Sequence, residues 1–328
     1  MKATQDWTDA RVHALRDLTP TVREFTLQVP GGASLHEPGG HLQVQLMVGG
    51  RLHTRSYSLI DAPGEASSPE FCRIAAKRLD AGKGGSLAMW QLAVGDSLRI
   101  SAPQNHFPLD LSARAYWLVA AGVGVTPLLG MAQLLAKRGA QVHMAYAARS
   151  ADELAYLAPL QASLGSRLQT FVSTAGQRMD LRDLVRQAPP DCQLYFCGPS
   201  PMLTDVRLAW GSAGRDMADL RYETFGTSGR LAPQAFRVKV PRHGLDIIVD
   251  SDTGLLDALE QNGVLALSDC RRGECGLCAM DVLRLTGEID HRDVFLTDEE
   301  KASNRKICVC VSRVVGEITL ETAYRPES

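Results

Sequence analysis

The stretch Asp269–Cys278, "DCRRGECGLC", constrains this chain more than any other. It places Cys270, Cys275 and Cys278 within nine residues and surrounds them with glycines and arginines. The chain has eight cysteines in 328 residues, and five of them lie in the last 60 positions. That total is too low for a disulfide scaffold, whereas clustered cysteines in a reducing compartment indicate metal or redox chemistry. We therefore expect a loop that binds a metal centre.

The spacing of these cysteines, C-x4-C-x2-C, is typical of a plant-type 2Fe-2S cluster. Gly273 and Gly276 would let the backbone pass close to the inorganic sulfides and turn its N–H groups toward them. Arg271 and Arg272 are expected to offset part of the cluster's negative charge. Zinc is the alternative, but the second pair of closely spaced ligands that a zinc site usually has is missing.

The fourth ligand of such a cluster has two candidates, Cys308 and Cys310, in "KICVCVSRVVGEITLET". They are two positions apart on a predicted strand, so their side chains are expected to face the same way. Periodicity alone leaves the choice open.

Three patterns of apolar and polar residues follow one another along the chain. From Arg11 to Phe107, alternating apolar and polar residues broken by turns predict an antiparallel barrel. From about Ala115, apolar strands such as "AYWLVAAG" alternate with helical stretches such as "VGVTPLLGMAQLLAKRG" and "ADELAYLAPLQASLG". This alternation predicts a parallel, doubly wound sheet. The segment from Gly226 to Gln234 has the composition of a linker.

The last of the three patterns begins with "AFRVKVPRHGLDIIVD", which predicts a hairpin that turns at 241–244. Thr253 is expected to cap a helix that Gly263 terminates. "GEIDHRDVFLTDEE" is expected to pack the domain and contact partners, and its "TDEE" predicts a solvated helix start.

Composition limits the class of protein. No segment approaches 18 consecutive apolar residues, and the first 20 residues lack the apolar core of a secretory signal. The 35 basic and 37 acidic residues nearly balance, and no run of like charge suggests nucleic acid or an anionic membrane as a partner. We expect a soluble, cytoplasmic protein that binds neither nucleic acid nor a membrane.

"RSYSL", Arg55–Leu59, resembles the flavin signature of the ferredoxin reductase superfamily. A guanidinium suits a phosphate, and an aromatic ring suits a flat cofactor. The resemblance implies that Arg55 holds the flavin phosphate, Tyr57 packs on the isoalloxazine and Ser58 hydrogen-bonds near its N5. A glycine-rich turn into a helix, further on, is expected to add phosphate donors. The other residues expected at the flavin are Ser56, Ala76, Lys77, Gly84, Gly85 and Ser86, with a solvated strand charge as the alternative role of Lys77.

"AAGVGVTPLLGM" resembles the nucleotide signature G-G-x-G-x-T-P of the same superfamily, except that Ala121 replaces the first glycine. These glycines lie between a strand and its helix, where free N–H groups and the helix dipole favour a pyrophosphate. "YFCGPSPML" resembles the later strand, which places Cys197 where nicotinamide approaches flavin, and "YETF" resembles the stretch that closes over the flavin. By itself, Cys197 would be read as a core thiol. The expected nucleotide-site residues are Gly122, Gly124, Thr126, Pro127, Cys197, Gly198 and Pro199, and those expected to be catalytic are Ser58, Cys197 and Phe225, of which Phe225 also contacts the flavin.

These motifs occur in the order flavin, nucleotide, ferredoxin, which resembles the phthalate dioxygenase reductase family. The resemblance implies FMN, NADH and a plant-type 2Fe-2S cluster with Cys270, Cys275, Cys278 and Cys310 as ligands. Cys310 is favoured because a valine, a small residue and a T-x-E-T-like ending follow it, as in plant-type ferredoxins. The implied fold is a multidomain chain with an antiparallel β-barrel FMN domain (1–109), a doubly wound α/β NAD domain (110–226), a linker (227–235) and an α+β β-grasp ferredoxin domain (236–328).

The implied function is electron transfer from NADH through FMN to the chain's own cluster and on to a separate Rieske-type oxygenase. NADH is favoured over NADPH because "AYAARSADEL" offers only Arg149 to a ribose phosphate. Two alternatives stay open. The chain could be an electron-transfer subunit or diaphorase for a non-oxygenase acceptor, or a flavin reductase with a structural zinc module.

Overall fold

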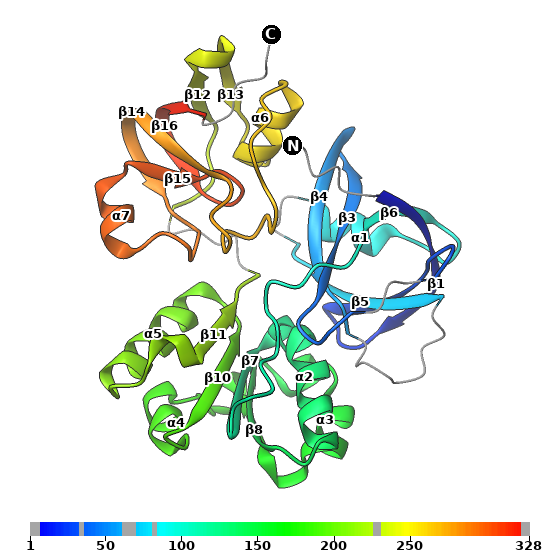
Figure 1. The fold of residues 1–328 in the computed structure, drawn as a ribbon. Coiled ribbons are helices and arrows are strands. Elements are labelled where there is room, and N and C mark those ends of the chain that lie inside the picture. The colour runs from blue at the N-terminus through cyan, green and yellow to red at the C-terminus, as the bar shows by residue number, and fades with distance from the viewer. Residues whose placement is uncertain (1–6, 33–35, 61–69, 81–83, 226–230, 323–328) are drawn as a thin grey trace. The chain divides into compact units, whose positions relative to one another are not determined.

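The computed structural model describes residues 7–32, 36–60, 70–80, 84–225 and 231–322 (Figure 1). The chain divides into two compact units, 1–225 and 226–328. The first unit contains an antiparallel and a parallel sheet, and the second contains a mixed sheet. Residues 227–230 of the predicted linker lie outside the described residues. None of the helices within the described ranges is long and apolar enough to cross a membrane.

An antiparallel sheet, six-stranded in the described residues, opens the first unit, in the order β4-β3-β6-β1-β2-β5. Its two edge strands meet where Leu59, just after β4, bridges Ile74 of β5, which closes the sheet into a barrel. The alternating apolar residues point inward, and Phe25, Leu27 and Val44 are fully buried. The predicted antiparallel barrel is confirmed. Its elements are β1 (Trp7–Asp17), β2 (Val22–Gln28), β3 (His41–Val48), β4 (Arg51–Ser58), β5 (Phe71–Lys77), α1 (Gly85–Gln91) and β6 (Ser97–Ser101).

A parallel sheet follows, with the order β11-β10-β7-β8-β9 over the described residues. Helices α2 and α3 cover one face and α4 and α5 the other (Figure 1), so the central strands β7 and β10 are buried almost throughout. The predicted doubly wound fold is confirmed. Its strands are β7 (Ala115–Ala121), β8 (Gln141–Ala148), β9 (Leu168–Val172), β10 (Cys192–Cys197) and β11 (Leu220–Glu223), and its helices are α2 (Val125–Lys137), α3 (Leu157–Leu164), α4 (Leu181–Gln187) and α5 (Ser200–Ser212).

The helix predicted for "ADELAYLAPLQASLG" is shorter than expected. A single 3₁₀ turn spans Ala151–Glu153, and α3 begins only after Tyr156, whose φ is 58°. The Tyr156 hydroxyl donates a buried hydrogen bond of 2.8 Å to Glu24 Oε2 in the barrel. Because this long-range contact fixes Tyr156 outside the helical conformation, the local helical pattern is overridden there.

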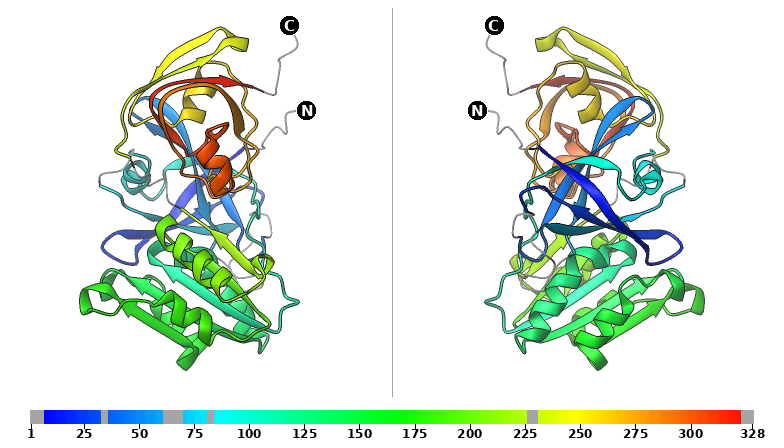
Figure 2. Two further views of the ribbon diagram at one scale, coloured as in Figure 1. Left: turned by 90° about the vertical axis from the view of Figure 1, so that its left-hand side faces the viewer. Right: turned by 90° about the vertical axis from the view of Figure 1, so that its right-hand side faces the viewer.

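The second unit folds around a mixed sheet in the order β13-β12-β16-β14-β15. The neighbours β12 and β16 run parallel, whereas β12–β13 is a hairpin that turns through Gly244 at φ 60°. Leu255, Leu256 and Leu259 of helix α6 are buried in the core of this unit, and the helix lies beside the sheet (Figure 2). This is the predicted α+β arrangement. Its elements are β12 (Phe236–Val240), β13 (Leu245–Val249), α6 (Leu255–Gln261), β14 (Ala279–Asp290), α7 (Asp298–Ser303), β15 (Lys306–Cys308) and β16 (Arg313–Glu321).

One capping prediction in this unit is wrong. The N-cap of α6 is Gly254, not Thr253, and the Thr253 hydroxyl donates to Asp252 instead. Gly263 does follow the helix end in a left-handed conformation, at φ 79°. At α7, Thr297 and Glu300 form a reciprocal capping box, so the predicted helix start is confirmed.

Candidate functional site

The cysteine loop turns three backbone N–H groups toward one sulfur. The amides of Arg272, Glu274 and Cys275 each lie 3.4 Å from Cys270 Sγ. Such a concave set of amides stabilises an anion, so it suits a thiolate that binds iron.

The two glycines of this loop are required by close packing. A Cβ on Gly273 would lie 2.6 Å from a Val311 methyl and 2.8 Å from Asp293 Cα, and one on Gly276 would lie 2.2 Å from the Phe295 ring. Both glycines also have positive φ. The segment around Asp293 and Phe295 therefore packs directly against the loop, which fits the expectation that "GEIDHRDVFLTDEE" packs the domain.

The thiols form two groups, Cys270 with Cys275, and Cys278 with Cys308 and Cys310. A hydrogen bond from Cys270 lowers the pKa of Cys275, and hydrogen bonds from Cys308 and Cys310 lower the pKa of Cys278. The Cys278 and Cys310 sulfurs are 3.1 Å apart. Among the residues that the structure describes, no three donors converge as they would on one metal ion. Each of the two irons of a 2Fe-2S cluster with four cysteine ligands needs two thiolates, and these two groups can supply them, so the donor set fits that cluster.

Cys308 and Cys310 differ in their surroundings. Cys308 ends β15 and is fully buried, whereas Cys310 lies in the turn that follows and is partly exposed. The expectation that both lie on one strand is therefore wrong. The backbone leaves the strand because Ser312 N–H donates to the Cys308 carbonyl, which closes a turn around Cys310. Both thiols remain close enough to affect Cys278.

The arginines of the loop bind carboxylates. Arg271 contacts Asp257 at 3.3 Å and Glu260 at 2.5 Å, and Arg272 contacts Glu274 at 3.4 Å. Their positive charges are therefore largely offset by these acids and are less available to the cluster than the sequence predicted.

Three predicted flavin residues, Arg55, Tyr57 and Ser58, lie on β4 of the barrel. The Arg55 side chain crosses Gly85 at the start of α1, where a Cβ would lie 2.9 Å from Arg55 Nε. Burial raises the pKa of Tyr57, so its hydroxyl stays protonated. Ser58 is buried, and its hydroxyl has no hydrogen-bond partner within the described part of the chain. A buried hydroxyl without a partner among the described residues is suited to bind a polar ligand.

The remaining predicted flavin residues have separate environments. Lys77 Nζ lies 3.9 Å from the Cβ position of Gly122, so it approaches the nucleotide motif rather than open solvent. The Ala76 carbonyl accepts from the Trp90 indole, and the Ser86 hydroxyl accepts from the Leu79 amide. Ser56 is half-buried within β4, and Gly84 caps α1 with φ 80°.

The two predicted nucleotide-binding motifs, "GVGVTP" and "CGP", approach each other closely at Gly124 and Cys197. A Cβ on Gly124 would lie 2.2 Å from the Cys197 carbonyl oxygen, so only glycine fits there. Ala121, which replaces a glycine of the signature, has its Cβ 3.1 Å from where a Cβ of Gly198 would stand. The missing side chain of Gly198 therefore accommodates Ala121. Thr126 donates to the Val123 carbonyl and closes the first turn.

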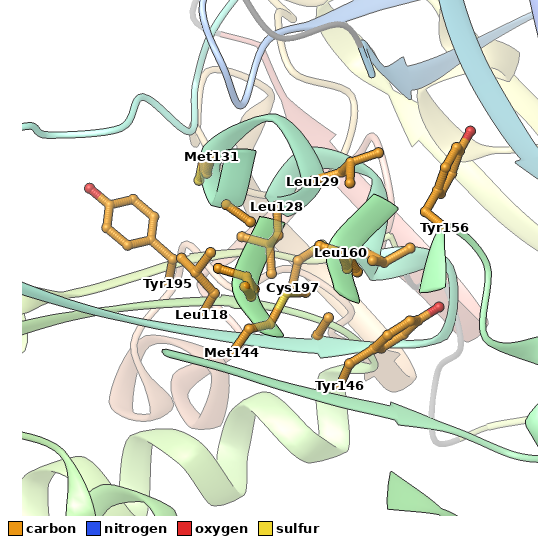
Figure 3. Close-up of a cluster of buried hydrophobic side chains, with 14 of the residues drawn as sticks. Leu118, Leu128, Leu129, Met131, Met144, Tyr146, Tyr156, Leu160, Tyr195 and Cys197 are labelled. Atoms are coloured by element: carbon orange, nitrogen blue, oxygen red, sulfur yellow. The ribbon is translucent and has the colours of Figure 1, made fainter. Parts of the chain in front are cut away.

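Cys197 and Phe225 belong to one apolar cluster. Cys197 is fully buried with Leu118, Leu128 and Met144 (Figure 3), and Phe225 packs against the same cluster. These two predicted catalytic residues therefore belong to the same core of the first unit. Pro127 is buried in the first turn of α2, and Pro199 is the N-cap of α5.

Sequence reasoning missed several residues at these sites. Glu223 is fully buried and pairs with Cys197 across β10 and β11, and Thr224 beside it is also buried. A carboxylate and a hydroxyl inside "YETF" were the available signal. Asp257 and Glu260 could not be assigned to the cluster loop, because nothing in the sequence links α6 to Arg271.

Comparisons with known proteins identify two of the domains. Residues 240–315 match the model of the 2Fe-2S iron-sulfur cluster binding domain, and residues 118–208 match the oxidoreductase NAD-binding domain. The chain is therefore a nicotinamide-dependent oxidoreductase with its own 2Fe-2S domain.

Full-length relatives narrow the class. The heme-dependent oxidative N-demethylase beta subunit of Ectopseudomonas mendocina (strain ymp) is 37% identical over 94% of this chain and 96% of its own. The 3-chlorobenzoate-3,4-dioxygenase reductase subunit of Comamonas testosteroni is 37% identical over 95% of both. The solved structure of phthalate dioxygenase reductase superposes with a TM-score of 0.80 at 29% identity, covering 96% of this chain and 98% of that one. The chain belongs to the phthalate dioxygenase reductase family and moves electrons from NADH through FMN to its 2Fe-2S cluster.

Proposed function

We propose that this chain is the reductase component of a two-component Rieske-type oxygenase and delivers its electrons to the oxygenase's Rieske cluster in the cytoplasm. Several full-length relatives are named as reductase subunits of dioxygenase or monooxygenase systems, which supports a separate oxygenase as the acceptor. The paired thiols around Cys270 and Cys278 carry the proposal, because they give the chain a one-electron carrier of its own.

The FMN is assigned to the barrel end. Arg55, lying across Gly85, would bind the phosphate, and Tyr57 would contact the ring system. The buried Ser58 hydroxyl, which has no partner among the described residues, would donate to the ring near the atom that receives hydride. The flavin, when bound, converts a two-electron donor into single electrons. The other proposed FMN residues are Ser56, Ala76, Lys77, Gly84, Ser86 and Phe225.

NADH is assigned to the glycine turn before α2. Gly122 and Gly124 leave two of the three positions of this turn without a side chain, so its amides can face a pyrophosphate. Cys197 and Phe225 would border the nicotinamide, and their apolar cluster would exclude water from the transfer. The other proposed nucleotide residues are Gly122, Thr126, Pro127, Gly198 and Pro199.

The relay is tested with Cys275→Ser, which removes one of the four proposed cluster ligands, Cys270, Cys275, Cys278 and Cys310. We expect the variant to lose cytochrome c reduction but to keep NADH-dependent reduction of the flavin, followed by stopped-flow absorbance. Cys72→Ala, in the barrel core, is the matched cysteine control and should keep both activities. Unchanged cytochrome c turnover in Cys275→Ser would contradict the relay.

A haem protein is the second candidate acceptor. It is favoured by the relative from Ectopseudomonas mendocina, which is named as heme-dependent. Single-turnover mixing of the reduced chain with a Rieske oxygenase or with a haem oxygenase separates the two. We expect fast oxidation of the cluster only by the Rieske protein, and fast oxidation only by the haem protein would reverse the assignment.

A further inference from the structure

Arg271 has a backbone conformation that is unusual for its residue type. Its φ is 52°, in the left-handed region, and it directly follows the proposed ligand Cys270. Only glycine enters this region readily, because a Cβ crowds the following carbonyl. A side chain other than glycine needs support from its surroundings there.

The left-handed residue shapes the loop around a sulfur. The chain reverses at Arg271, and the amides of Arg272, Glu274 and Cys275 then point at Cys270 Sγ from 3.4 Å. A left-handed residue beside right-handed ones is the backbone pattern that makes an anion-binding concavity. N–H groups on a cluster sulfur favour the reduced state, which carries one more negative charge.

Support for Arg271 comes from α6. Its guanidinium reaches Asp257 Oδ1 at 3.3 Å and Glu260 Oε1 at 2.5 Å, and its side chain is only 17% exposed. The two carboxylates are three residues apart, so they lie on the same side of the helix. Helix α6 is itself fixed in the core by Leu255 and Leu259.

We infer that Arg271, Asp257 and Glu260 form a clamp that holds the amides on Cys270 and thereby raises the reduction potential of the cluster. The clamp is a positioning device, since none of its three side chains is a proposed ligand. The inference rests on the proposed ligand set, in which Cys270 binds iron. Arginine suits the role because its rigid fork can bind two carboxylates at once.

The test compares two effects that would change the reduction potential of the cluster in opposite directions. Asp257→Asn/Glu260→Gln removes two negative charges, which by charge alone would raise the potential of a nearby anionic cluster. Loss of the clamp predicts the reverse, a shift to lower potential, because the amides leave the sulfur. The potential is measured by spectroelectrochemical titration, with EPR of the reduced cluster as a second readout. Asp298→Asn/Glu299→Gln on α7 is the matched control, which removes two charges without touching the clamp and should not lower the potential.

A rescue experiment completes the test. In the Asp257→Asn/Glu260→Gln background, Arg271→Gly should move the potential back up, because glycine adopts the left-handed conformation unaided. Arg271→Ala in that background should not. The inference is overturned if the double variant keeps or raises the potential, or if the glycine and alanine versions behave alike. Absence of iron and sulfide from the wild-type protein would instead overturn the proposed ligand set.

Discussion

The cluster loop and the flavin–nucleotide site are assembled over very different lengths of chain. The loop takes three of its four proposed ligands from the nine residues Cys270–Cys278, and its amides bind a sulfur only a few positions away. The proposed flavin–nucleotide site would combine Arg55, the turn before α2, Cys197 and Phe225, which lie far apart along the chain. A local site can be disturbed alone, whereas a dispersed site depends on the packing of its whole unit. Each prediction below tests this contrast.

The largest effect is expected at the local site. Cys310→Ser should remove nearly all iron and sulfide, because Cys310 stands in a turn 3.1 Å from Cys278 and completes its pair. Cys308→Ser, which alters the buried thiol two positions earlier, should keep the cluster. Iron and acid-labile sulfide analysis distinguishes the two, and flavin reduction by NADH should be normal in both. The reverse pattern would make Cys308 the ligand.

A glycine substitution tests how the dispersed site depends on packing. Gly124→Ala should lower the free energy of unfolding of the first unit by about 3 kcal/mol, because the new methyl meets the Cys197 backbone, which cannot move aside. It should also raise the KM for NADH. Gly211→Ala, in α5 of the same unit, meets nothing within 4 Å and should stabilise by about 0.5–1 kcal/mol. Chemical denaturation followed by flavin fluorescence measures both, and equal effects would refute the packing argument.

Ser58→Ala tests one polar contact of the dispersed site. Loss of a hydroxyl that donates to the flavin is expected to slow flavin reduction about fivefold, the equivalent of about 1 kcal/mol. Stopped-flow absorbance with saturating NADH gives the rate. Ser163→Ala, in α3, removes a hydroxyl that donates to the Pro159 carbonyl and should leave the rate unchanged. If Ser58→Ala behaves in the same way, Ser58 has no role in the transfer.

The smallest effect concerns a contact that joins distant segments. Hydrogen bonds from Ser112 and Gln193 lower the pKa of Asp110 to about 2. Because the folded pKa lies below the ordinary value of 3.8, the charge stabilises the fold above pH 4, and this contribution is lost as the pH falls toward 2. Asp110→Asn should cost about 0.5 kcal/mol at pH 7, a figure reduced for solvent screening, and progressively less below pH 4. Urea denaturation across this range is the measurement, and a pH-independent difference would contradict it.

The sequence was most informative where interactions are local. The C-x4-C-x2-C spacing and the glycines of the cluster loop predicted a cluster-binding loop, because ligands a few residues apart fix their own geometry. The order of the sheets followed from the change between period-two and helical patterns. The wrong cap at Thr253 shows the limit of this reasoning, because a hydroxyl at the right position can still bond a neighbouring Asp252.

Long-range contacts could not be predicted from the sequence. Tyr156 leaves the helical conformation in contact with Glu24, which lies 132 positions earlier. Arg271 was expected to offset cluster charge, but two acids on α6 take up that charge. Burial of Glu223 opposite Cys197 depends on the pairing of two strands. In each case the decisive partner is set by tertiary packing, which local patterns do not encode.

The position of β16 in its sheet has a consequence for biosynthesis. This strand follows all the other strands of the second unit along the chain, yet it lies at the centre of the sheet between β12 and β14. A nascent chain on the ribosome therefore cannot close this unit until Arg313–Glu321 has emerged. Cys310 and the three loop cysteines all precede this strand, so the proposed ligands are synthesised before the sheet around them is complete, and their thiols need protection from oxygen until then.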